Sequence, residues 1–231
     1  MRGWKRWALF GGIAVVVVVV GGPFVYFHFI QGDAPAPLSI DTSPTTVASG
    51  APSTAPASLD GTWKVASGSR AGYRVKETVF GQSGTAVGRT SAVTGRLTLA
   101  GTQVSAASFS VDMTQVTSAK SLRDGQFQGR IMDTAQFPTA TFALTKPIAL
   151  GTIPASGVTI TPNATGKLTL HGTTRTITIA LDAVQTGNVI QVSASVPITF
   201  ADYSIDNPSG GPASVGDSGT LEFLLVLAKP A

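Results

Sequence analysis

Short runs of alternating polar and apolar residues, punctuated by glycine, make up most of the chain from Leu59 to Ala231. In one such run Phe109, Val111 and Met113 alternate with polar residues. A period of two is typical of half-buried β-strands with short turns between them. The pattern predicts an all-β domain of about eight antiparallel strands. Because closure removes exposed sheet edges, we expect an extended, closed or nearly closed barrel, which at this size can hold one small ligand.

One stretch, residues 118–142, departs from the alternation. Its apolar residues fall closer to a helical period and include Leu122, Phe127, Ile131 and Met132. Gly125 and Gly129 would weaken a helix here by roughly 1 kcal/mol each relative to alanine. We therefore expect one short or broken helix, followed by a turn at Phe137-Pro138. A single helical insert in a β chain is suited to closing one end of a barrel as a lid.

The first 30 residues predict a membrane anchor. Arg2, Lys5 and Arg6 precede an uncharged run, 7–30, that contains six consecutive valines. About 20 apolar residues cross a hydrocarbon core about 30 Å thick, and the basic cluster places the N-terminus in the cytoplasm. A cleaved secretory signal is the alternative, although its apolar region is usually only about 7–15 residues long. Both interpretations place the rest of the chain outside the cytoplasm, in the second case as a secreted or periplasmic protein.

Two further segments follow. Residues 31–58 are rich in proline, alanine, serine and threonine and lack aromatic residues, a composition typical of a disordered linker. Residues 59–231 are long enough for one domain with a sizeable core. The predicted organisation is thus an anchor (1–30), a linker (31–58) and a β-barrel domain (59–231).

The composition excludes several classes of site. The chain has no cysteine, which rules out disulfides and thiolate ligands, and only two histidines, His28 and His171. We therefore predict no metal site and no cofactor. From Leu59 onward 13 basic and 10 acidic residues are scattered without an arginine-rich run, so we predict no nucleic-acid binding.

Several segments form a recognisable series along the chain. They are Trp63-Lys64-Val65, 68–75 (GSRAGYRV), 93–97 (VTGRL), Ser121, Arg123-Asp124 and Phe127 followed by 137–142 (FPTATF), 166–175 (GKLTLHGTTR), 200–205 (FADYSI) and 219–227. Taken in order, they resemble the YceI family, the lipocalin-like polyisoprenoid-binding proteins of bacteria. The resemblance covers nearly all of the region from Leu59 to Lys229. It implies an extended antiparallel barrel with a long apolar channel, a polyisoprenoid or other long-chain lipid as partner, and no catalytic residues.

A long apolar ligand needs an apolar lumen and a few polar groups at its mouth. The candidate lumen residues are Phe109, Phe127, Ile131, Met132, Phe142, Phe200 and Tyr203. Each could equally pack in an ordinary core. Arg123, His171 and Arg175 are candidates for contacting a head group. The alternative for Arg123 is an ion pair with a nearby carboxylate, such as Asp124 or Asp112, that fixes the lid, and for His171 a hydrogen bond to backbone in a turn.

The sequence therefore predicts a membrane-tethered, extracytoplasmic lipid-binding protein that is not an enzyme. The alternative is a structural or protein-interaction module whose barrel is filled by its own side chains. A homodimer is left open. The segment Gly216-Asp217-Ser218-Gly219 resembles the serine motif of chymotrypsin-like proteases. However, His171 precedes Ser218 too closely for a two-barrel protease, and a turn into the last strand explains the same residues.

Overall fold

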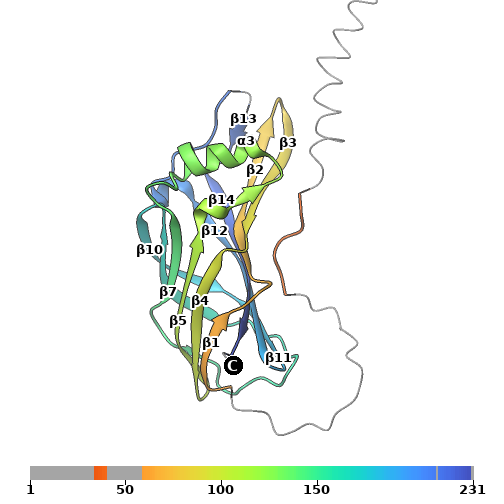
Figure 1. Ribbon diagram of the computed structural model, residues 1–231, viewed down its shortest axis with the longest axis vertical. Coiled ribbons are helices and arrows are strands. Elements are labelled where there is room, and N and C mark those ends of the chain that lie inside the picture. Colours follow the sequence, from red (N-terminus) through yellow and green to blue (C-terminus); the bar gives the residue numbers. More distant parts are fainter. Residues whose placement is uncertain (1–33, 41–58, 212, 230–231) are drawn as a thin grey trace, which may run out of the picture.

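The computed structural model describes residues 34–40, 59–211 and 213–229 (Figure 1). The predicted membrane-spanning run 7–30, and the predicted linker apart from 34–40, lie outside these residues. None of the helices within the described ranges has the length and apolar character needed to span a bilayer.

The described residues form an all-β domain with one short helical segment. The strands are β1 (Gly61–Val65), β2 (Arg70–Val79), β3 (Gln82–Thr90), β4 (Val93–Ala100), β5 (Gln103–Asp112), β6 (Thr117–Ser118), β7 (Thr139–Leu144), β8 (Ile148–Ala149), β9 (Asn163–Leu170), β10 (Thr173–Ala180), β11 (Asp182–Thr186), β12 (Val189–Thr199), β13 (Ala213–Val215) and β14 (Ser218–Ala228). The helical elements are η3 (Met113–Gln115), α3 (Ser121–Gln126), η4 (Phe127–Ile131) and η5 (Phe200–Tyr203).

All strands belong to one antiparallel sheet that rolls around an elongated interior (Figure 1). β14 lies at its centre, with β12 along one side and β2 and β1 in succession along the other. β10 is followed almost directly by β11, so that one bent stretch of chain pairs first with β9, through β10, and then with β12, through β11. Bent strands of this kind, together with the short strands β6, β8 and β13, raise the count from the expected eight to 14. We expected a closed or nearly closed barrel. Within the described part of the chain no hydrogen-bonded ladder joins β10 to β12, so the barrel is not closed.

The alternation of residue types sets which face of each strand is buried. Along β12, Val192, Val196 and Ile198 point into the interior, whereas Ser195 and Thr199 lie on the outside. β5 carries a bulge: Thr98 of β4 pairs with Ala106 and Leu99 pairs with Val104, so that Ser105 of β5 has no paired residue in β4. Without this extra residue the alternation would turn one end of β5 away from the interior.

The predicted helical segment is confirmed as a broken helix. α3 continues directly into η4, where the Met132 N–H donates to the Phe127 carbonyl at 2.9 Å, a bond across five residues. A turn at 134–136 precedes Phe137-Pro138, and β7 begins at Thr139. We call α3 and η4 together the lid. The lid lies across one end of the rolled sheet, near β13 and the β2–β3 turn (Figure 1).

Candidate functional site

The interior of the rolled sheet holds a cavity of about 840 Å³. Volumes of about 300–1,000 Å³ are typical of small-molecule sites. Inward-facing residues line it along β2 from Ala71 to Val79, a distance of about 26 Å at ~3.3 Å per residue. It extends from the lid to the loop 150–162 at the other end, which we call the loop end. The shape therefore suits a long, narrow ligand.

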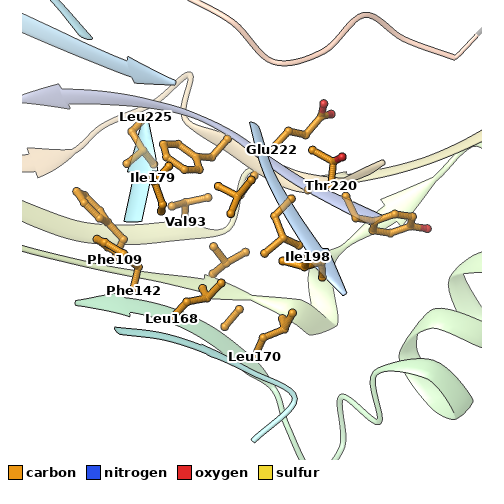
Figure 2. Close-up of a pocket in the computed structure, with 18 of the residues that line it drawn as sticks. Val93, Phe109, Phe142, Leu168, Leu170, Ile179, Ile198, Thr220, Glu222 and Leu225 are labelled. Carbon is orange, nitrogen blue, oxygen red and sulfur yellow. The ribbon is translucent and has the colours of Figure 1, made fainter. Parts of the chain in front are cut away.

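The cavity wall is apolar in its middle part. Figure 2 shows Val93, Phe109, Phe142, Leu168 and Leu225 converging on the interior from different strands, whereas the Glu222 carboxylate points away from it. Phe109, Phe142 and Phe223 are only partly buried although they face inward, because they border the hollow interior. The alternative of a barrel filled by its own side chains is therefore wrong.

Aromatic rings that face inward lie close against glycines of the neighbouring strand. A Cβ atom on Gly166 would lie 2.3 Å from the Phe142 ring, and one on Gly88 would lie 2.4 Å from the Tyr73 ring. Such distances are far inside van der Waals contact, so only glycine permits these ring positions. Because the rings pack against the wall, part of the interior that they would otherwise fill stays open.

Six of the seven predicted lumen residues line the cavity. They are Phe109, Phe127, Ile131, Met132, Phe142 and Phe200. Tyr203 does not line it: its side chain is buried in the adjacent core, where burial and then the nearby Asp202 carboxylate raise the pKa of its hydroxyl. Ser204, the next residue, has a positive φ of 56°, and the reversal it makes takes the chain out of η5.

The lid is fastened to β2 by an ion pair at the cavity's edge. The Arg123 Nη2 atom lies 2.5 Å from the Glu77 Oε1 atom, and both side chains are largely buried and line the cavity. The position of Arg123 thus fits the alternative in which it fixes the lid through an ion pair, but its partner is Glu77, which sequence spacing did not indicate. Asp124 instead accepts the Ser118 N–H, and Asp112 accepts the Thr114 N–H.

Tyr73 is a lumen residue that sequence reasoning missed. Its ring stacks on Phe127 of the lid, with centroids 4.9 Å apart and planes 13° apart. Burial raises the pKa of Tyr73 to about 12, partly opposed by the Arg123 charge. The hydroxyl is therefore neutral at physiological pH and offers a hydrogen bond without a charge. Its inward position in the alternation Ala71, Tyr73, Val75 was the available signal.

The other two head-group candidates lie away from the cavity. His171 occupies the β9–β10 turn, with a positive φ of 48°, and its Nδ1 atom lies 3.4 Å from the Tyr203 carbonyl oxygen. Its ring packs edge-on against Phe137. Arg175 is about half exposed and pairs with Asp202 on the outer surface. Neither side chain lines the cavity.

The loop end is closed mainly through the backbone. The Gly157 N–H donates to the Gln185 carbonyl at 2.7 Å, and Ile160 forms a bridge with Ala183. Ile153 and Val158 line this end of the cavity while remaining 37% and 49% exposed. Gln185 is the polar side chain that lines the cavity here, whereas the charged side chains of Glu77, Lys120, Arg123 and Arg130 line it at the lid.

Comparisons with known proteins agree with this architecture. The YceI-like domain family matches residues 63–227. A polyisoprenoid-binding domain from Saccharophagus degradans, implicated in plant cell wall breakdown, superposes with a TM-score of 0.61 at 20% identity, covering 74% of this chain and 99% of that one. Burkholderia cenocepacia BcnA gives 0.53 at 21% identity, covering 68% and 95%. Campylobacter jejuni YceI protein gives 0.51 at 12% identity, covering 85% and 100%. A comparison with curated proteins found no match.

Proposed function

Because the chain belongs to the family of YceI-like domains, we propose that it binds one long-chain apolar lipid, a polyisoprenoid or a similar amphiphile, inside the rolled sheet. The observation that carries the proposal is the continuous apolar cavity between the lid and the loop end. Burial of an apolar chain there would contribute about 25 cal/mol per Å² of surface removed from water. The proposed role is binding and not catalysis.

The distribution of polar groups supports one orientation of the ligand. Arg123, Glu77 and the neutral Tyr73 hydroxyl border the cavity at the lid, together with Gln126 and Arg130 of the lid itself. A polar head group would find hydrogen-bond partners here and few at the loop end. The tail would then extend toward Ile153 and Val158.

We further propose that residues 7–30 anchor the protein in the cytoplasmic membrane, with the lipid-binding domain on the extracytoplasmic side. This part of the proposal depends on the length of the apolar run and the basic residues before it. The protein would sequester or carry its lipid near the outer face of that membrane.

Lipid analysis of the purified full chain tests the proposal. Two tryptophan substitutions on adjacent residues of β5 provide a matched pair: Ala107 lines the cavity, whereas Ala106 is exposed on the outside. After mild detergent extraction and mass spectrometry, the unmodified chain and Ala106→Trp should carry a long-chain lipid, and Ala107→Trp should lack it. Equal lipid content in both variants, or none in the unmodified chain, would sink the proposal. The pair also controls for lipid carried along by residues 7–30, which all three proteins share.

A further inference from the structure

The outer face of β14, β2 and β3 carries a buried carboxylate held by two arginines. Glu222 is 1% exposed, and its carboxylate accepts hydrogen bonds from Arg89 Nε at 2.8 Å and Arg74 Nε at 3.3 Å. Gly72 on β2 pairs with Glu222 of β14 on one side and with Arg89 of β3 on the other. A side chain on Gly72 would not fit, because its Cβ atom would lie 2.1 Å from the Gly88 carbonyl oxygen. Arg89 donates to the Glu222 carboxylate from its Nη2 atom as well, at 2.7 Å. The arrangement fixes both guanidinium groups at the outer face of the sheet.

Residues 34–40 dock on these two arginines. Arg74 Nη2 donates to the Pro35 carbonyl at 2.6 Å, and Arg89 Nη2 donates to the Ala36 carbonyl. Ile40, at the other end of the segment, is buried. We call residues 34–40 the strap; it runs beside the sheet in Figure 1. Part of the predicted linker is therefore in contact with the domain.

The strap has a defined direction. β2 runs from Arg70 toward the β2–β3 turn at Phe80, so Arg74 lies nearer that turn than Gly72 does. Pro35 sits at Arg74, and Ala36 sits at Arg89, which is level with Gly72. The N-terminal end of the strap therefore points toward the β2–β3 turn, which is at the lid end of the domain (Figure 1).

The chain between the strap and the predicted anchor is about as long as the part of the sheet between Arg74 and the β2–β3 turn. Ile30, where the apolar run ends, lies five positions before Pro35, a reach of at most about 17 Å. Phe80 lies six positions after Arg74, just past the end of β2, a distance of about 20 Å. While the strap is docked, Ile30 cannot lie beyond the level of the turn by any substantial distance. A bilayer entered at Ile30 therefore lies within reach of the lid end.

The side chains at the lid end fit a bilayer. Phe80 is 66% exposed and has a positive φ of 50°, and Gly81 follows with a φ of 77°. In a two-residue turn of this kind asparagine, aspartate or glycine is favoured, so an exposed phenylalanine there is explained neither by packing nor by turn geometry. Leu122, on α3 beside the cavity, is 77% exposed.

We propose that the lid end docks on the bilayer surface, with Phe80 and Leu122 inserted among the lipids and the strap holding the domain in that orientation. The inference rests on the proposed membrane anchor and lipid ligand, and it places the lid where a lipid could pass tail-first from the bilayer into the cavity. Arg123 and Arg130 near Leu122 already bind Glu77 and the Pro208 carbonyl. We therefore expect docking to depend on apolar insertion and to persist at high salt.

An environment-sensitive fluorophore on a single cysteine tests the orientation, because the chain has no other cysteine. The full chain is reconstituted in phosphatidylcholine nanodiscs with the label at Gln82→Cys, next to the turn, or at Val158→Cys, at the loop end. We expect a blue-shifted emission, quenched by spin-labelled lipid, at position 82 and not at position 158. A water-like emission at position 82, or equal shifts at both positions, would overturn the inference.

Two variants separate insertion from the strap. Phe80→Asp should abolish the shift at position 82 without unfolding the domain, because aspartate tolerates a positive φ. A strap variant, Leu38→Ser with Ile40→Ser, should also abolish it, whereas Ser39→Ala in the same segment should not. An undiminished shift in either Phe80→Asp or the strap variant would contradict the proposal.

The same samples distinguish this inference from the proposed function. Co-elution of the chain with nanodiscs reports the anchor, and the lipid retained after detergent extraction reports the cavity. A chain that co-elutes and retains lipid but shows no shift at position 82 would refute docking alone. A shift at position 82 in a chain that retains no lipid would refute the lipid ligand alone.

Discussion

The lid end and the loop end of the cavity are closed by different kinds of contact. At the lid, an ion pair between Arg123 and Glu77 and a ring stack between Tyr73 and Phe127 join a helical segment to the sheet. At the loop end, the segment 150–162 is joined mainly by backbone hydrogen bonds to Gln185 and Ala183. We therefore expect that truncating one side chain can open the lid, whereas the loop end offers few side-chain contacts to remove.

The largest effect should come from Phe127→Ala. Phe127 is buried in the lid-end core and stacks on Tyr73, and truncating a buried phenylalanine costs about 3 kcal/mol or more. We expect this loss in the free energy of unfolding from denaturant titration, together with loss of bound lipid. Leu122→Ala, on the exposed side of the same segment, is the control and should stay within about 0.5 kcal/mol. Similar losses in both variants would show that the stack does not hold the lid.

Arg123→Ala should have the next largest effect, because it removes the guanidinium partner of Glu77. A hydrogen bond to a charged group contributes about 1.5 kcal/mol or more, and about 1.4 kcal/mol corresponds to a tenfold change in rate. We expect release of a fluorescent lipid analogue to become about tenfold faster. If the ion pair is responsible, adding Glu77→Gln to Arg123→Ala should change the rate little further. Independent, additive effects would assign Arg123 some other role.

The elevated pKa of Tyr73 predicts a pH dependence at the lid. The native protein holds this proton up to about pH 12, whereas an unfolded tyrosine loses it near pH 10. The contribution of Tyr73 to stability is therefore complete below about pH 10 and is lost as the pH rises toward 12. Unfolding measurements across this range should show a falling stability that Tyr73→Phe makes less steep. An identical slope in Tyr73→Phe would mean that the hydroxyl is not buried against the lid.

The smallest effect should come from the loop end. Ile153 is partly exposed and has no side-chain hydrogen bond to break, so Ile153→Ser should change stability by no more than about 0.5 kcal/mol. Release of the lipid analogue should keep its rate. An acceleration comparable to that of Arg123→Ala would show that the ligand leaves through the loop end, and the contrast between the two ends would fail.

The sequence was informative where local pattern decides the structure. The period of two placed the strands, and the loss of that period at 118–142 placed the lid. Among the predicted lumen residues, Phe109 and Phe142 lie on strands with this alternation, whereas Phe127, Ile131 and Met132 belong to the lid region with its helical spacing. Tyr203 followed neither pattern, because its orientation depends on the reversal at Ser204 and not on strand period.

Contacts between distant segments could not be predicted in this way. Arg123 and Glu77 are 46 residues apart, and their pairing depends on where the lid crosses β2. The strap is a stronger case. Its composition is that of a linker, and what binds it is a pair of arginines brought together by Glu222 from a third strand. Only the register of β14, β2 and β3 creates that site.

The most direct test of the central claim is to locate the two ends of a bound lipid. A polyprenyl phosphate long enough to span the cavity, with a photoreactive diazirine on its terminal isoprene unit, would be loaded into the full chain and cross-linked, and the modified peptides mapped by mass spectrometry. We predict modification of the loop end, at or near Ile153 and Val158, and its loss in Ala107→Trp. Modification confined to the outer surface, or unchanged in Ala107→Trp, would contradict a lipid that enters through the lid and lies along the cavity.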